Sequence, residues 1–500
     1  MGIIRKQSIT STLFIYIGFA IGAINTLLFT GKYFTEAQYG LTRELFDLST
    51  TFFALSNLGG ISILYRFYPY YRDRLPLQER DLFTKMLMLS LSGYIVIGIL
   101  AYVFQGFIGQ YFIVNSPLLV HYLYTVYPMT LFYLLFSMLE AQAWNHFSSI
   151  AANFFKELGL RLLTTVLIAL YIFKWIDFNQ FIIAYSFLYG IIFLGLLFYL
   201  YRKGQISLTF KTSKITRRMY KKMMPFASFV FFASLFTMLA RNFDGFIISS
   251  VLSLTQTGIF NFANYLTSLM EGPQRGLVSV SVVVIAQAWK DKDMERIASI
   301  YRKTALNMLL FAGFLFGLVL LNLHAAFEVF HIKASFLQGE MVLVFLGLTK
   351  MVELGTGVNA QIIATSRYWR VDFISTVSLL LMLIPLNYIL IRHFGITGSA
   401  MATLIAYFFF NLVRYIFIWV KFDMQPFTWR NGAVLVILAV NFFIVRLLVD
   451  VSNPLLDIAC KSALFTGLNA AVLLSLHISE DANKLWSMGL EKVKAIISRS

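Results

Sequence analysis

Apolar residues dominate this chain in long runs, which short polar stretches rich in Arg and Lys separate. A helix that crosses the roughly 30 Å hydrocarbon layer of a membrane needs about 20 apolar residues, at about 1.5 Å of rise per residue. Runs of this length recur along the whole sequence. Because lipid offers the backbone no hydrogen bonds, the pattern predicts an all-α polytopic membrane protein.

The runs predict about fourteen transmembrane helices joined by short connections. The first run is longer than the roughly 7–15-residue core of a cleavable signal, and no small-residue cleavage site follows it, so we expect a retained helix. The expected spans are 8–31, 41–65, 83–104, 121–143, 153–173, 178–200, 224–250, 257–288, 304–323, 341–364, 371–391, 398–420, 431–449 and 457–476.

Basic residues gather in alternate loops, and this bias predicts the orientation. The opposite loops hold little beyond Lys32, Lys174, Lys333 and Arg392. By the positive-inside rule, both termini are expected in the cytoplasm. This topology accounts for most of the formal charge of +17, so nucleic acid is not an expected partner.

Composition agrees with a membrane protein, because 59% of the residues are hydrophobic against about 45–50% in soluble domains. The single cysteine, Cys460, rules out an intramolecular disulfide and a cysteine metal cluster. The histidines show no i, i+4 metal pair, and there is no G-x-S-x-G elbow or Gly-rich phosphate loop after a strand. We therefore expect no enzyme, no resident metal and no cofactor.

The longest polar segment, Tyr201 to Lys222, lies near the middle of the chain and predicts two lobes. Self-similarity supports them: 35–41 resembles 253–259, and 183–185 recurs as 405–407. Such matches indicate parallel repeats of six helices followed by two further helices. The predicted divisions are lobe 1–203 (spans 1–6), basic linker 204–222, lobe 223–422 (spans 7–12), spans 13–14 at 423–478 and an amphipathic cytoplasmic tail at 479–500.

Charged residues inside the predicted spans recur in pairs three or four residues apart, which places both members on one helix face. An intramembrane charge costs about 2.5–3.5 kcal/mol on insertion scales, so each pair is either self-neutralising or functional. A polar cavity between the lobes would house the set. The pairs are Arg43 with Asp47, Glu157 with Arg161, Arg241 with Asp244, Glu271 with Arg275, and Lys350 with Glu353.

Two spans are interrupted at corresponding depths, one at Gly59 and Gly60 and the other at Gly272 and Pro273. Paired broken helices indicate a transport site, although membrane helices also tolerate Gly and Pro as simple kinks. Glu140 has no basic partner one turn away in its own span, which leaves a protonated carboxyl, a coupling-ion site or a structural hydrogen bond open.

The chain resembles the polysaccharide-transporter branch of the multidrug/oligosaccharidyl-lipid/polysaccharide exporter superfamily over essentially its whole length. The resemblance rests on loose motifs in the right order, although Phe260 replaces the family's Tyr and Ser399 its Ala. The motifs are Ala37-Gln38-Tyr39-Gly40-Leu41, Arg241-Asn242-Phe243-Asp244, Thr257-Gly258-Ile259-Phe260 and the stretch from Gly395 to Thr403.

This resemblance implies a V-shaped pair of lobes in the bacterial inner membrane. By alternating access they would flip an undecaprenyl-pyrophosphate-linked oligosaccharide, such as an O-antigen unit of lipopolysaccharide. Cations would bind the pyrophosphate through charge-assisted hydrogen bonds, with Arg43, Arg241, Arg275 and Lys350 as candidates. Glu140 and the partner carboxylates Asp47, Asp244, Glu271 and Glu353 would hold those cations or a coupling ion, H⁺ or Na⁺. Membrane lipids, a glycan polymerase and glycosyltransferases are the expected partners.

Three other functions stay open at this point. A cation-coupled drug exporter of the same superfamily usually needs only twelve spans. A peptidoglycan-precursor flippase is expected to carry an arginine-containing N-terminal signature that is missing from 9–28. A membrane glycan polymerase would need a sizeable outer loop, whereas the predicted outer loops are short. A purely structural scaffold would not need five intramembrane charge pairs.

Overall fold

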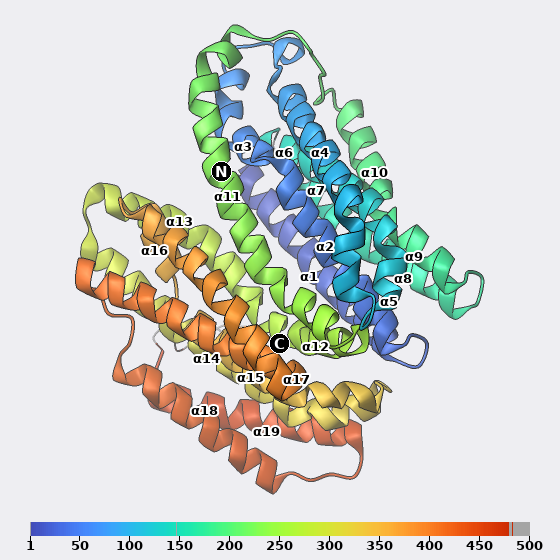
Figure 1. The fold of residues 1–500 in the computed structure, drawn as a ribbon. Coiled ribbons are helices and arrows are strands. Elements are labelled where there is room, and N and C mark those ends of the chain that lie inside the picture. Colours follow the sequence, from blue (N-terminus) through green and yellow to red (C-terminus); the bar gives the residue numbers. More distant parts are fainter. Residues whose placement is uncertain (1, 147, 480–482, 484–500) are drawn as a thin grey trace, which may run out of the picture. The chain divides into compact units, whose positions relative to one another are not determined.

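The computed structural model describes residues 2–146, 148–479 and 483, and every regular element within them is helical (Figure 1). Nine helices in this part of the chain are long and apolar enough to cross a membrane, or ten with the bent pair α2 and α3. The multi-pass helical architecture is therefore confirmed. The count of fourteen and the orientation stay predictions.

Two compact units divide the chain, Met1–Asn261 and Phe262–Ser500. The N-terminal unit contains eleven α-helices and most of α12. They are α1 (Gly2–Thr30), α2 (Glu36–Asn57), α3 (Gly60–Arg72), α4 (Leu82–Phe112), α5 (Pro117–Tyr122), α6 (Val126–Asn145), α7 (Ser149–Asn153), α8 (Leu160–Ile172), α9 (Phe178–Ser186), α10 (Leu188–Arg202), α11 (Lys214–Val251) and α12 (Leu254–Ser268).

The described part of the C-terminal unit continues with seven α-helices. They are α13 (Gly272–Asp291), α14 (Met294–Val329), α15 (Glu340–Gly355), α16 (Asn359–Thr365), α17 (Trp369–Phe422), α18 (Trp429–Leu448) and α19 (Pro454–Ser475). The last two lie side by side and both pack on α14 (Figure 1). Buried Leu309, Leu438 and Phe465 join these three helices in one apolar core.

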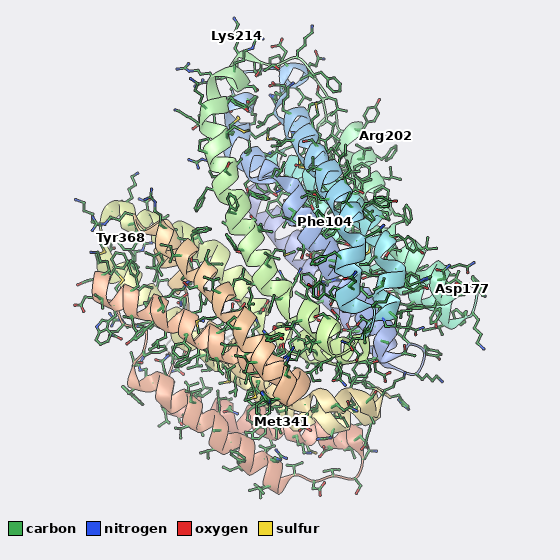
Figure 2. The ribbon with its side chains drawn as sticks, in the orientation of Figure 1. Phe104, Asp177, Arg202, Lys214, Met341 and Tyr368 are labelled. Atoms are coloured by element: carbon green, nitrogen blue, oxygen red, sulfur yellow. The ribbon has the colours of Figure 1, made fainter. Side chains whose placement is uncertain are left out.

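The outer surface of the helices is itself apolar. On α4, Val103 is 66% exposed and Phe104, which Figure 2 labels, is 53% exposed. Large exposed apolar surfaces are rare on soluble monomers, whereas lipid requires them. This surface agrees with the membrane assignment.

Both predicted helix interruptions are present. Leu58 and Gly59 have left-handed φ angles of 48° and 76°, and α2 and α3 meet there at a bend of 49°. The second break is a 3₁₀ turn, Leu269–Glu271, directly before α13 begins at Gly272. A third break lies inside α17, where Gly395 (φ 58°, ψ −141°) separates two helices. The hinge role of the first two stays a prediction.

The polar segment after α10 is bound to the N-terminal unit along much of its length (Figure 2 labels Arg202 and Lys214 at its ends). Lys85 Nζ donates to the carbonyl of Phe210 at 3.1 Å, and the buried Asp81 carboxylate accepts from the Ser213 N–H at 3.0 Å. The contacts group α11 with the N-terminal unit, whereas the sequence predicts 223–250 in the second lobe. The predicted tail lies outside the described residues apart from Ser479 and Asn483.

Candidate functional site

In the N-terminal unit, a buried amide contributes to holding α11 on α2. Asn242 donates from Nδ2 to the carbonyl of Asp47 at 2.9 Å and to the hydroxyls of Thr50 and Thr51, both at 3.1 Å. An amide in a membrane helix must find such partners, because leaving it unsatisfied is costly. Asn242 thus helps to fix the positions of Arg241 and Asp244, the two charged residues of the same motif.

Glu44, one turn before Asp47, is fully buried between the same helices. Its Oε1 accepts from Ser249 Oγ at 3.0 Å, whereas Oε2 is buried with no hydrogen-bond partner among the described residues. Gly245 makes room for this carboxyl, since a Cβ there would lie 2.9 Å from Oε2. The charge-pair pattern does not include Glu44, because no basic residue stands three or four positions from it.

Arg43, Asp47 and Arg241 lie in one electrostatic group. Among the described side chains Arg43 and Asp47 do not form the ion pair that their spacing predicts. Instead the Arg43 guanidinium lies over the Tyr39 ring, 5.2 Å from its centroid. The charges of Arg43 and Arg241 both act on Asp47, and Arg241 itself is exposed. The two arginines thus share a site with Asp47 and the neighbouring buried Glu44 carboxyl, and Asp244 is half-buried one turn beyond Arg241.

Glu140 has a basic partner after all, on a neighbouring segment. Lys156 Nζ lies 3.0 Å from both carboxylate oxygens of Glu140, which is 8% exposed. Lys156 belongs to a π-helical turn, Phe154–Gly159, and π turns are rare and often occur at functional sites. A residue sixteen positions away on a different helix cannot be inferred from helical spacing.

The predicted pair Glu157 and Arg161 is formed, with Nη2 and Oε2 3.2 Å apart. Arg161 also lies over the Phe19 ring at 5.0 Å. Gly18 permits this approach, because a Cβ there would collide with the Glu157 carbonyl oxygen and would lie 2.8 Å from Arg161 Nη1. The geometry favours the structural interpretation of this pair, in which Glu157 on the π-helical turn neutralises Arg161 of α8 while the Arg161 guanidinium packs against α1.

In the C-terminal unit, Lys350 is held by two carboxylates. Its Nζ lies 2.5 Å from Glu271 Oε1 and 2.9 Å from Glu353 Oε2. The predicted pair with Glu353 is thus present, and the 3₁₀ turn before α13 brings Glu271 to the same ammonium. The Arg275 side chain lies outside the described residues, so its pairing and its role stay predictions.

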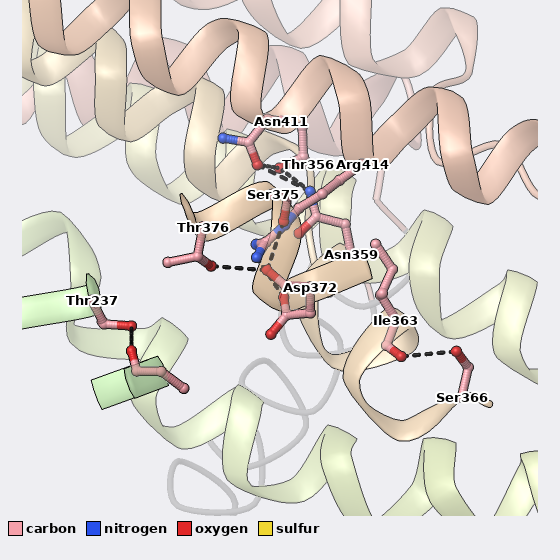
Figure 3. A network of polar contacts seen from close by, with 11 residues as sticks. Thr237, Thr356, Asn359, Ile363, Ser366, Asp372, Ser375, Thr376, Asn411 and Arg414 are labelled. Carbon is pink, nitrogen blue, oxygen red and sulfur yellow. Dashed lines mark hydrogen bonds and ion pairs between the residues drawn. The ribbon is translucent and has the colours of Figure 1, made fainter. Parts of the chain in front are cut away.

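A second polar network in this unit was not predicted (Figure 3). Arg414 forms an ion pair with Asp372, donates from Nε to Ser375 Oγ at 3.0 Å, and is only 6% exposed. Nearby, Asn411 accepts from Thr356 Oγ1 at 2.9 Å and from Asn359 at 3.0 Å. These partners are distant in sequence, and only the kinked path of α17 brings its two arms together.

An apolar cavity of about 640 Å³ lies between α14, α15, the second arm of α17 and α18. Leu309, Met351, Phe408 and Leu435 are among the side chains that line it. Since α18 supplies one wall, the cavity depends on the helix pair that follows the predicted repeats.

No protein-family model matches the chain, and no curated protein sequence matches it. Solved structures do. The Lipid II flippase MurJ in an inward closed conformation superposes with a TM-score of 0.74 at 15% identity, over 94% of this chain and 99% of that chain. An inward-facing multidrug resistance MATE family transporter of the MOP superfamily gives 0.65 at 15% identity, over 81% of this chain and 94% of that one.

A MOP superfamily transporter from Pyrococcus furiosus gives a TM-score of 0.58 at 16% identity, over 84% of this chain and 96% of that one. Identities this low establish the fold alone. The chain therefore has the helical fold that these transporters share, which the sequence motifs had indicated.

Proposed function

We propose that this protein is a flippase that carries an undecaprenyl-pyrophosphate-linked oligosaccharide across the bacterial inner membrane by alternating access. The observation that most supports a lipid-linked substrate is the apolar cavity of about 640 Å³, of which α18 forms one wall. A small polar solute would not bind favourably in an apolar cavity of that size. A polyprenyl chain can enter it from the bilayer, because the cavity lining is as apolar as the lipid that the chain leaves.

Arg43 and Arg241 are the best-placed cations for the pyrophosphate. They act on the same carboxylate, Asp47, and the exposed Arg241 is open to a bound anion. Lys350 is less suitable, because a pyrophosphate would meet Glu271 and Glu353 around the same ammonium. Asp47 would accompany the two arginines when no substrate is bound, as would Asp244.

The matched experiment uses a host that lacks its own exporter for the glycan. Arg43→Gln with Arg241→Gln is compared with Arg217→Gln and Arg218→Gln, which removes two charges from the start of the same α11. Surface glycan is measured against the protein level on immunoblots. We expect export to fall at least tenfold only in the first pair, in line with the loss of two charge-assisted contacts. Equal export by both pairs would contradict the assignment.

A peptidoglycan-precursor flippase is the second candidate. One observation favours it, the superposition on the Lipid II flippase over 94% of this chain, against 81% and 84% for the two other transporters. Rescue of cells depleted of their own Lipid II flippase would support this candidate. Rescue of surface-glycan export without growth rescue would support the first.

A further inference from the structure

The Glu44 carboxyl lies at the contact between α2 and α11, and the proposed substrate site does not use it. Its side chain is 0% exposed. Oε1 accepts from Ser249 Oγ at 3.0 Å, whereas Oε2 is buried without a hydrogen-bond partner among the described residues. An ionised carboxylate in this place would be a buried charge that no cation compensates, which is strongly unfavourable.

A second carboxyl, Asp47, adjoins the first. A Cβ on Gly245 of α11 would lie 2.9 Å from Glu44 Oε2 and 3.6 Å from Asp47 Oδ2, so both carboxyls border the same point on α11. Two buried carboxylates so close together repel each other, and such a pair keeps a proton on one member. Asp47 is suited to be the ionised member, because the positive charges of Arg43 and Arg241 act on it.

No cation takes the place of that proton at Glu44. Among the described residues, Asp47 is the only titratable group whose charge acts on Glu44, and that charge is negative. This holds for α1, α4, α5, α6 and α12 as well as for α11. The titratable side chains close to Asp47 or to the two arginines are Tyr39 on α2, Tyr133 on α6, Tyr185 on α9 and Asp244 on α11.

We propose that Glu44 and Asp47 form a proton-binding site in which Glu44 holds the proton and Asp47 stays ionised. The proton is on Oε2, the oxygen that has no other partner, while Oε1 accepts from Ser249. Since α11 covers the site, moving α11 away from α2 would admit water to Glu44, which would then release its proton to that water. Proton binding and the contact between α2 and α11 therefore stabilise each other. The site lies within the N-terminal unit and does not depend on the transported substrate.

Infrared spectroscopy of the full chain, in a detergent without ester groups, tests the protonation state directly. A protonated carboxyl has a C=O stretching band of its own, which shifts in D₂O. Wild type should show this band at neutral pH, and Glu44→Gln should lose it. Glu79→Gln, which removes an exposed carboxylate, is the control and should keep the band. Asp47→Asn should move the loss of the band on alkaline titration to lower pH, because the repelling charge is gone.

Amide hydrogen exchange in α2 and α11 tests the link to the helix contact. After correction for the intrinsic effect of pH, exchange in wild type should accelerate at least threefold in both helices at the alkaline pH that removes the band. In Glu44→Gln, whose side chain is neutral at every pH, it should not change. Three results would overturn the proposal: equal carboxyl bands in wild type and Glu44→Gln, equal exchange in the two proteins at alkaline pH, or a Glu44→Gln protein that fails to fold. The last counts because the amide matches the neutral acid in shape.

Discussion

Gly40 on α2 and Gly258 on α12 lie backbone to backbone. A Cβ on Gly40 would come within 2.9 Å of the Gly258 nitrogen, and a Cβ on Gly258 within 3.2 Å of the Gly40 nitrogen. These two glycines occupy the same position in the two similar stretches, 35–41 and 253–259. The repeat motif therefore meets its own copy, and the absence of a side chain at both positions permits the contact.

Gly40→Ala should consequently destabilise the protein by about 1–3 kcal/mol, because the new methyl group would also collide with the Leu254 carbonyl oxygen. Thermal unfolding of the detergent-solubilised protein measures this change. Gly106→Ala in α4 is the matched control, since no described atom outside its own helix turn lies within 4 Å of the position that its Cβ would take. That control should be neutral or stabilising by up to about 1 kcal/mol. Equal behaviour of the two variants would contradict the close contact.

Lys156→Met should destabilise the protein by about 3–5 kcal/mol, because it leaves the buried Glu140 carboxylate without its cation. Adding Glu140→Gln should restore much of that loss, since the remaining group is then uncharged. Thermal unfolding of both single variants and the double variant gives the coupling free energy. Additive losses would show that the two groups do not act as a pair.

Protein stability should fall with acid through His146, which follows α6. Burial, and then the positive charges of Arg80 and Arg72, lower the pKa of His146 to about 4. Its Nε2 lies 2.5 Å from the Tyr68 hydroxyl, consistent with a neutral ring that accepts this hydrogen bond. Between the unfolded pKa of about 6.5 and about 4, the unfolded chain binds more protons, so stability decreases as pH falls through that window.

The measurement is the unfolding temperature at neutral and mildly acidic pH. His146→Gln should flatten the pH dependence, whereas the same substitution at the exposed His121 should leave it as in wild type. An unchanged slope in the His146 variant would assign the acid sensitivity elsewhere.

Asp81→Ala should release the segment between α10 and α11. The carboxylate accepts from the Ser213 N–H at 3.0 Å and from the Thr216 hydroxyl, whose Oγ1 lies 2.8 and 2.9 Å from its two oxygens, so its loss removes both charge-assisted contacts. Trypsin should then cut at Lys211 or Lys214 about tenfold faster than in wild type. Asp73→Ala, which removes a carboxylate of an exposed pair with Arg72, is the control. Equal cleavage rates in the two variants would contradict the role of Asp81 in holding this segment.

The sequence predicts best what depends on neighbouring residues. Spacing along one helix identified Glu157 with Arg161 and Lys350 with Glu353, and the glycines at 59 and 60 marked the bend after α2. The four-residue spacing of Arg43 and Asp47 did not correctly predict an ion pair, because the Arg43 guanidinium lies over the Tyr39 ring on the same helix instead.

Contacts between helices could not be predicted in the same way. Lys156 with Glu140, and Arg414 with Asp372, depend on how each helix is rotated about its axis. In a chain that is apolar on nearly every side, the hydrophobic pattern does not specify that rotation. Glu44 was missed for the same reason, since its partner Ser249 lies on α11.

The π-helical turn at Phe154–Gly159 determines how the helix that follows it in the span is rotated about its axis. Its widened repeat accommodates one residue more than a regular α-helix would, and the α-helical phase resumes at Leu160. Removing a single residue there would turn the downstream helix by about 100° relative to the upstream part. Arg161 would then leave the niche beside Gly18 while Glu140 kept its place. The extra residue of the π-helical turn thus lets one span place Lys156 on the Glu140 carboxylate and Arg161 beside Phe19 of α1.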